Sequence, residues 1–231
     1  MTASSPYLLV DSGTIDGIAI AQGEDAHLNL KSQRAFAILA VLAIAPSLPN
    51  AEEVKNNKHV AIEKTVDLNA QEANRIYDEL AEAMTNGYAL SGIALINEYR
   101  SWKRYNTAPY VSAAHGNRYL NNYVNETGKN YGNLKVGERL PAGTILAKDS
   151  FTVTVERQAF PAALFIMEKL GSGQSPKTAD WRYLVIYPDG SLAGDTTGSN
   201  PEAVEYCHAC HRAKATRDYT FYVPEPYRVE R

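Results

Sequence analysis

Hydrophobic residues recur at helical spacing in residues 67–84, where polar and charged residues occupy the positions between them. The apolar positions on the shared face are Leu68, Ile76, Leu80 and Met84. Asn86 and Gly87 follow, and glycine readily supplies the left-handed residue that often ends a helix. The pattern therefore predicts an amphipathic helix over residues 67–84 that ends at Asn86 and Gly87.

Beyond this helix the periodicity changes to short, alternating runs rich in β-branched residues, which predict strands at 144–155, 162–168 and 181–187. Turn residues bound these runs, namely Pro141–Gly143, Gly171–Gly173 and Pro188–Gly190. No helical pattern separates them. We therefore expect an α+β fold, mainly an antiparallel β-sheet, with flanking helices near the start and the end of the chain.

Residues 31–51 have the outline of a secretory signal peptide. Lys31 and Arg34 precede the apolar run from Ala35 to Ala45, and cleavage after Ala51 fits the pattern. The run is shorter than the roughly 20 residues that a membrane-spanning helix needs. We expect export to the periplasm as a soluble protein and no integral membrane segment, with a buried core helix as the alternative.

Residues 1–30 carry four acidic side chains and no Lys or Arg, which does not fit an export signal. We expect this stretch to be an unstructured leader or the result of a misassigned start, with translation beginning near Leu28 or Leu30. Residues 52–231 then form a single mature domain, which is long enough to bury one core.

The composition is that of a globular chain, with 45% hydrophobic residues and a formal net charge of −3. This charge provides no field that would attract nucleic acid, so we expect no nucleic-acid partner. The two cysteines stand three residues apart, which is too few for a disulfide framework. They indicate a local chemical site.

Cys207, Cys210 and His211 form a Cys-x-x-Cys-His motif, which is typical of covalent c-type haem attachment. Two thiols on one helical turn can each form a thioether with a haem vinyl group. His211 can then bind the iron. The motif predicts one covalently bound haem c on a C-terminal helical segment, with Cys207, Cys210 and His211 binding the cofactor and His211 as the metal ligand.

Three alternatives use the same residues: a zinc knuckle, a thioredoxin-like redox pair and a structural disulfide. A zinc knuckle lacks a second cysteine pair, and a redox pair would need a βαβ context. No Met or His follows His211, so we expect the sixth iron position to be open or to hold an exchangeable ligand. Open iron favours binding or catalysis over electron transfer alone.

Several motifs occur together in a familiar order. Gly143–Lys148 comes first, followed by an apolar run that ends Ile166–Glu168, then Asp180–Trp181, then the haem motif, and finally Asp218–Phe221. Over roughly residues 90–227 the sequence resembles the cytochrome P-460 family. The resemblance implies a periplasmic monohaem protein with a mainly antiparallel β fold, commonly a homodimer, that oxidises hydroxylamine to nitrogen oxides and passes electrons to another cytochrome.

The resemblance also assigns two further site residues. It places Lys148 where a lysine amine of the family is joined covalently to the haem, and Glu168 where a distal carboxylate helps to move protons. A sister group, cytochrome c′-beta, lacks the cross-link and binds nitric oxide. The alternatives to a hydroxylamine oxidoreductase are thus a nitric oxide binding protein and a plain electron carrier.

Without the resemblance, these residues have ordinary interpretations. Lys148 alternates with Ser150, Thr152 and Thr154, as on a solvated strand face. Glu168 shares a face with Leu164 and Ile166, where burial would favour proton uptake, but a glutamate near a strand end can also reach water. His115 lies in a Gly/Asn loop, which is typical of a hydrogen-bonded structural histidine.

Overall fold

A computed structural model describes residues 66–230. The expected leader (residues 1–30) and signal peptide (31–51) lie outside the described residues. Residues 66–230 contain two α-helices, α1 (Ala70–Ala89) and α2 (Glu205–His211). The 3₁₀-helices are η2 (Ala94–Asn97), η3 (Tyr99–Ser101), η4 (Ala113–His115), η5 (Glu126–Asn133), η6 (Pro176–Thr178), η7 (Pro201–Val204), η8 (Arg212–Arg217) and η9 (Glu225–Tyr227). None of the described helices is long and apolar enough to cross a membrane.

Helix α1 begins with a capping box. The Asn69 side chain accepts a hydrogen bond from the backbone N–H of Glu72, and the Glu72 carboxylate accepts one from the backbone N–H of Asn69. The predicted end of this helix was wrong, because α1 continues through Gly87 to Ala89. A Cβ atom at Gly87 would lie 2.0 Å from the carbonyl oxygen of Pro188. Gly87 therefore permits a close backbone approach rather than a helix end.

The described residues form one eight-stranded antiparallel sheet, so the expected α+β fold is confirmed. The strand order is β1-β3-β4-β6-β7-β8, with β2 also paired to β3 and β5 to β4. The strands are β1 (Lys103–Arg104), β2 (Tyr110–Ser112), β3 (Arg118–Val124), β4 (Ile145–Val153), β5 (Ala159–Pro161), β6 (Leu164–Lys169), β7 (Trp181–Ile186) and β8 (Leu192–Asp195). The three predicted strands correspond to β4, β6 and β7.

Strand β3 was not predicted, although all seven of its residues are buried. Its centre is polar, which hides the strand from a hydrophobicity pattern. Asn121 accepts a hydrogen bond from the Asn106 amide at 2.7 Å, and the Asn122 amide donates one to the Tyr110 hydroxyl at 2.7 Å. These long-range partners make burial of the two amides tolerable.

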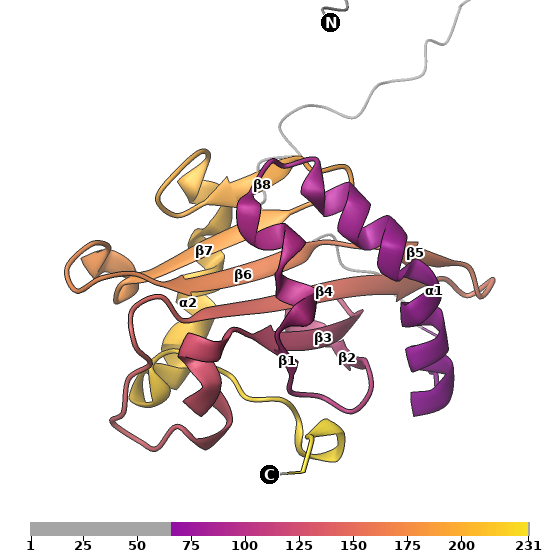
Figure 1. Ribbon diagram of the computed structural model, residues 1–231, viewed down its shortest axis with the longest axis horizontal. Helices are drawn as coiled ribbons and strands as arrows, with labels where there is room; N and C mark the ends of the chain where they lie inside the picture. The colour runs from indigo at the N-terminus through magenta and orange to yellow at the C-terminus, as the bar shows by residue number, and fades with distance from the viewer. Residues whose placement is uncertain (1–65, 231) are drawn as a thin grey trace, which may run out of the picture. The chain divides into compact units, whose positions relative to one another are not determined.

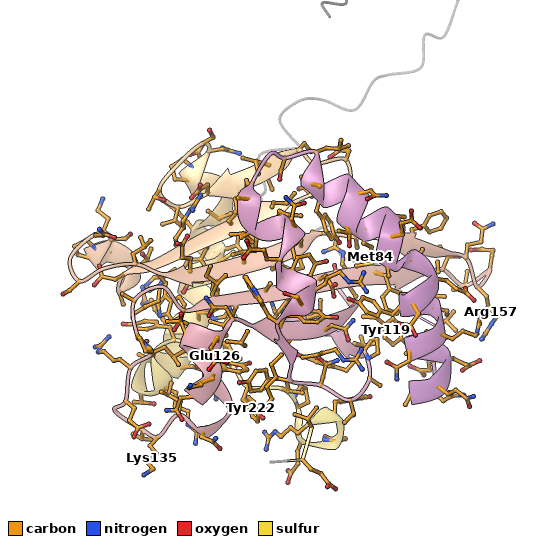
Figure 2. All side chains as sticks on the ribbon, viewed as in Figure 1. Met84, Tyr119, Glu126, Lys135, Arg157 and Tyr222 are labelled. Carbon is orange, nitrogen blue, oxygen red and sulfur yellow. The ribbon has the colours of Figure 1, made fainter. Side chains whose placement is uncertain are left out.

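The two faces of the sheet carry two separate cores. Side chains of α1 pack on one face against Ala147, Ile166 and Leu184, and Met84 and Tyr119 belong to this core (Figure 2). The other face carries Leu146, Phe165 and Tyr183 with the C-terminal segment that includes α2. Figure 1 shows α1 in front of the sheet and α2 behind it.

A polar cluster lies inside the α1 core. The fully buried Asp149 carboxylate accepts hydrogen bonds from the hydroxyls of Tyr77 at 2.6 Å and Tyr99 at 3.1 Å, and the hydroxyls of Tyr77 and Tyr123 lie 2.6 Å apart. Burial raises the pKa of Asp149 to about 6, although these hydrogen bonds and the charge of Arg100 oppose the shift. The carboxylate ties α1 and η3 to strand β4.

Asp149 should make the stability of the protein depend on pH. The folded protein binds this proton more tightly than the unfolded chain, so the free energy of unfolding should fall as the pH rises from about 4 to about 6. The contribution is at most about 3 kcal/mol. Urea titrations of the wild type and Asp149→Asn at several pH values check this. Between about pH 4 and pH 6 the free energy of unfolding of Asp149→Asn should depend less on pH than that of the wild type. An identical pH dependence in both proteins would contradict the raised pKa of Asp149.

Candidate functional site

A pocket opens on the sheet face opposite α1, between strands β2, β4, β6 and β7 and the C-terminal segment. Its cavity volume is about 200 Å³. Most of its walls are apolar or aromatic. The lining residues are Tyr110, Ser112, Ala114, His115, Leu146, Lys148, Phe165, Ile166, Met167, Tyr183, Leu184, Val185, Tyr206, Cys207, Cys210, His211, Phe221, Tyr222 and Pro224.

Helix α2 brings the whole Cys-x-x-Cys-His motif to this pocket. Cys207 and Cys210 are three residues apart on the helix, so their side chains lie on neighbouring turns of one face. Both thiols are free, Cys207 half-buried and Cys210 exposed. His211 ends the helix and is 8% exposed. The structure therefore presents two unbonded thiols and one imidazole to a single cavity.

The hydrogen bond of His211 fixes its tautomer. Its Nδ1 lies 2.6 Å from the backbone carbonyl oxygen of Tyr219. A carbonyl can only accept a hydrogen bond, so Nδ1 carries the proton and Nε2 has a free lone pair. Burial, together with the nearby charge of Lys148, lowers the pKa of His211 to about 4. The imidazole is thus neutral at pH 7, in the form that binds iron.

Two aromatic rings hold the His211 imidazole from the sides. The ring of Tyr183 lies 5.6 Å from it, and that of Phe221 lies 5.2 Å away in an edge-on arrangement. Tyr183 comes from strand β7 and Phe221 from the segment that follows η8. The imidazole plane is therefore set by the sheet as well as by its own helix.

Lys148 faces the same pocket from strand β4. It stands opposite Phe165 of β6 and Asn122 of β3, and paired residues of an antiparallel sheet share a face. Burial lowers the pKa of Lys148 to about 8, with the nearby Cys210 opposing the shift. The structure thus brings Lys148 together with Cys210 and His211, and about a tenth of its amines are neutral at pH 7. The solvated-face interpretation of Lys148 was wrong.

The other interpretations of the cysteine motif find no support in the geometry. Burial raises the pKa of Cys207 to about 12, whereas a redox-active thiol needs a lowered pKa. The sheet is antiparallel and offers no βαβ unit. Within residues 66–230, no three His, Cys, Asp or Glu side chains are grouped as a metal site would need.

Glu168 is not brought to the pocket. It pairs with Ile145 and Arg182 across the sheet, and its carboxylate accepts a hydrogen bond from Arg182 Nη1 at 3.0 Å. The sequence pattern placed Glu168 on the same face of β6 as Ile166. The strand register shows that this face points away from the pocket. Ile166 faces the α1 core, while its neighbour Phe165 shares the pocket face with Lys148.

His115 lines the pocket from η4, although its sequence suggested an ordinary structural residue. Its Nδ1 lies 2.8 Å from the hydroxyl oxygen of Ser112, which also lines the pocket. Its ring packs 5.0 Å from that of Phe165. A titratable imidazole with a defined hydroxyl partner therefore lies on the sheet side of the cavity.

These residues fit a haem. The thiols and the neutral imidazole supply the attachment and ligation chemistry, and the pocket walls are mainly apolar, as a flat hydrophobic macrocycle requires. Lys148 adds a nucleophilic amine on the sheet side.

Comparison with known families agrees with this chemistry. The family model for cytochrome P460 matches residues 96–222, and the chain belongs to this family. Membership implies a haem cofactor with its iron and an association with haem-dependent redox chemistry. The resemblance inferred from the sequence motifs is confirmed. No curated protein matches the chain.

Sequence reasoning missed the carbonyl oxygen of Tyr219 and the ring of Tyr183. A backbone carbonyl has no sequence signal, because any residue could supply it. The ring of Tyr183 was hidden among 15 tyrosines, and its alternation with Val185 was the signal that could have placed it.

Lys148 should be unusually reactive before haem is attached. At pH 8 about half of its amines should be neutral, whereas an ordinary lysine with a pKa near 10.5 is almost fully charged. Brief acetylation of haem-free protein followed by peptide mass spectrometry measures this. Lys129 is the control, because its ion pair with Glu126 raises its pKa. Equal labelling of both lysines at pH 8 would contradict the expectation.

Proposed function

We propose that the protein is an exported monohaem c-type cytochrome that oxidises hydroxylamine to nitric oxide or nitrous oxide and passes the electrons to another cytochrome. The observation that carries this proposal is the position of Lys148 in the same pocket as Cys207, Cys210 and His211. In the family this lysine position joins the macrocycle and accompanies hydroxylamine oxidation.

Each of these side chains has a distinct role in the proposal. Cys207 and Cys210 would hold a haem by adding their S–H groups across its vinyl groups to form thioethers, and His211 would bind its iron through Nε2. Lys148 would hold the macrocycle through its amine, where the resemblance implies a covalent link. A bound haem would supply redox chemistry. The residues of the pocket orient the macrocycle and keep bulk water from it.

Hydroxylamine oxidation to nitric oxide releases three protons with three electrons, so the pocket needs a proton acceptor. We assign this role to His115 rather than to Glu168. His115 lines the pocket and has the Ser112 hydroxyl as its neighbour, whereas Glu168 faces the α1 side and is paired with Arg182. Ser112 and His115 together offer a route for protons from the cavity.

The assignment predicts different effects for two matched variants. His115→Gln should lower the turnover of hydroxylamine by about 10²-fold, the low end for the loss of a general base. Glu168→Gln should leave it within a few-fold, because its carboxylate is outside the pocket. Steady-state assays of both haem-containing variants with an artificial electron acceptor measure this. A larger loss for Glu168→Gln than for His115→Gln would reject the assignment.

Substitution of Lys148 should affect hydroxylamine oxidation and nitric oxide binding differently. Lys148→Ala should still attach haem through Cys207 and Cys210 and bind nitric oxide, but it should lose hydroxylamine oxidation, since the cross-link is the feature that distinguishes the family from its gas-binding sister group. Lys129→Ala, at an exposed position on η5, is the control. Full turnover by Lys148→Ala would contradict the proposal and favour a role that needs no cross-link.

One observation favours a second function. Met167 and His115 both line the pocket, so a side chain is available as a sixth iron ligand. Met84, by contrast, is buried in the α1 core. A plain electron carrier would use such a ligand and show a low-spin ferric spectrum. A high-spin ferric spectrum at neutral pH supports the open site of the hydroxylamine oxidoreductase.

Three further properties belong to the same proposal. The apolar run of residues 35–45 supports export through a signal peptide cleaved after Ala51, and thus a periplasmic location. Family resemblance supports a homodimer and an electron-accepting cytochrome as the redox partner. Sedimentation of the purified haem protein tests the dimer directly.

A further inference from the structure

The turn that follows the helical segment of the haem motif has an unusual backbone. Asp218 and Tyr219 are consecutive non-glycine residues with φ values of 48° and 63°. Aspartate tolerates this left-handed region, but a bulky tyrosine rarely adopts it. Such a conformation persists only where the surrounding contacts hold it in place. Contacts with the rest of the fold must therefore hold Asp218 and Tyr219 in this conformation.

The anchor of this turn is the Asp218 carboxylate, whose side chain is fully buried. Its Oδ1 accepts a hydrogen bond from Lys169 Nζ at 2.7 Å, and its Oδ2 accepts one from the backbone N–H of Leu140 at 3.0 Å. Lys169 is itself held, since Nζ donates to the Ala179 carbonyl at 3.0 Å and lies 4.9 Å from the Trp181 ring centroid. The turn is thus fastened to β6, β7 and the loop before β4.

Stability alone is a weak explanation for this pair. A buried ion pair pays a desolvation cost that often cancels its attraction, so well-packed apolar residues would hold the core as well. What an ion pair adds is geometry, because each atom has one place in a network of directed hydrogen bonds. The network fixes the position of the backbone at Asp218 and therefore of the next peptide.

That next peptide carries the carbonyl that His211 uses. The Tyr219 oxygen accepts the His211 Nδ1–H at 2.6 Å, while the Tyr219 N–H donates to the Lys214 carbonyl at 2.9 Å. The hydrogen bonds of the Asp218 carboxylate go to Lys169, Leu140 and Arg139 and not to the imidazole. Its carboxylate acts on the histidine through one residue of strained backbone.

We propose that Asp218 is a positioning residue for the axial ligand: through its buried contacts with Lys169 and Leu140 it holds the left-handed turn that directs the Tyr219 carbonyl at His211. The proposal rests on His211 as the iron ligand but not on hydroxylamine as the substrate. A strong hydrogen bond from Nδ1–H makes the imidazole a better electron donor and lowers the reduction potential of the iron. The turn therefore sets that potential.

The test measures two properties of the ligand bond in the haem-containing protein. Asp218→Asn keeps the shape and the left-handed preference but loses the charge, and Asp218→Ala removes the anchor. Both should raise the reduction potential and lower the iron–histidine stretching frequency of the ferrous state, with the larger shifts in Asp218→Ala. Lys169→Met, which removes the cation from the same network, should shift both in the same direction and serves if the Asp218 variants do not fold.

Asp189→Asn is the matched control. Asp189 also accepts a backbone hydrogen bond in a turn, from Ser191, but its hydrogen bonds stay within that turn and do not reach Lys169 or Asp218. This variant should leave the potential and the stretching frequency unchanged. If the Asp218 and Lys169 variants lose only thermal stability and keep both spectroscopic values, Asp218 is a structural clamp and the proposal is overturned.

Failure of the proposed function gives a different result. A wild-type protein that binds haem but does not oxidise hydroxylamine rejects the enzyme assignment, while the shifts in the Asp218 variants still support the positioning role. Unchanged potentials in variants of an active enzyme reject the positioning role alone.

Discussion

The register of strand β4 against β6 is the constraint on which the site depends. Because side chains alternate across a sheet, pairing Lys148 with Phe165 turns the lysine toward the pocket and its neighbour Asp149 toward the α1 core. A slip of one residue would bury Lys148 under α1 and place Asp149 beside the proposed haem. Strand β4 thus contributes Lys148 to the pocket on one face and Asp149 to the α1 core on the other. The tyrosine hydroxyls around Asp149 help to hold this register from the side away from the site.

The other half of the site depends on the C-terminal segment. Helix α2 carries the thiols and the imidazole, but the helix alone does not orient His211. Its hydrogen-bond partner comes from Tyr219, and its flanking rings come from β7 and from Phe221. The buried pair of Lys169 and Asp218 joins this segment to the sheet. The orientation of the His211 imidazole is therefore a property of the tertiary fold, and a short peptide with the same motif would lack it.

The sequence was most informative where one residue type has one chemical use. The spacing of Cys207, Cys210 and His211 identified the pocket, and alternating apolar runs located β4, β6 and β7. Strand β3 escaped prediction because its buried asparagines find partners far away in the sequence. The alternation correctly placed Glu168 on the same face as Ile166. The sequence could not show that this face packs against α1 and that the opposite face borders the pocket. His115 has the hydrogen bond expected of a structural histidine, and only the fold shows that its loop also borders the cavity.

The central claim is that one haem is held from both sides of the pocket, by α2 and by β4. Proteolysis of the haem-containing protein, followed by mass spectrometry of the haem peptides, tests it most directly. The account predicts that the peptide with Cys207 and Cys210 and the peptide with Lys148 carry the same macrocycle. A macrocycle on the cysteine peptide alone would contradict the cross-link, and a protein matured with haem available that carries none would contradict the whole assignment.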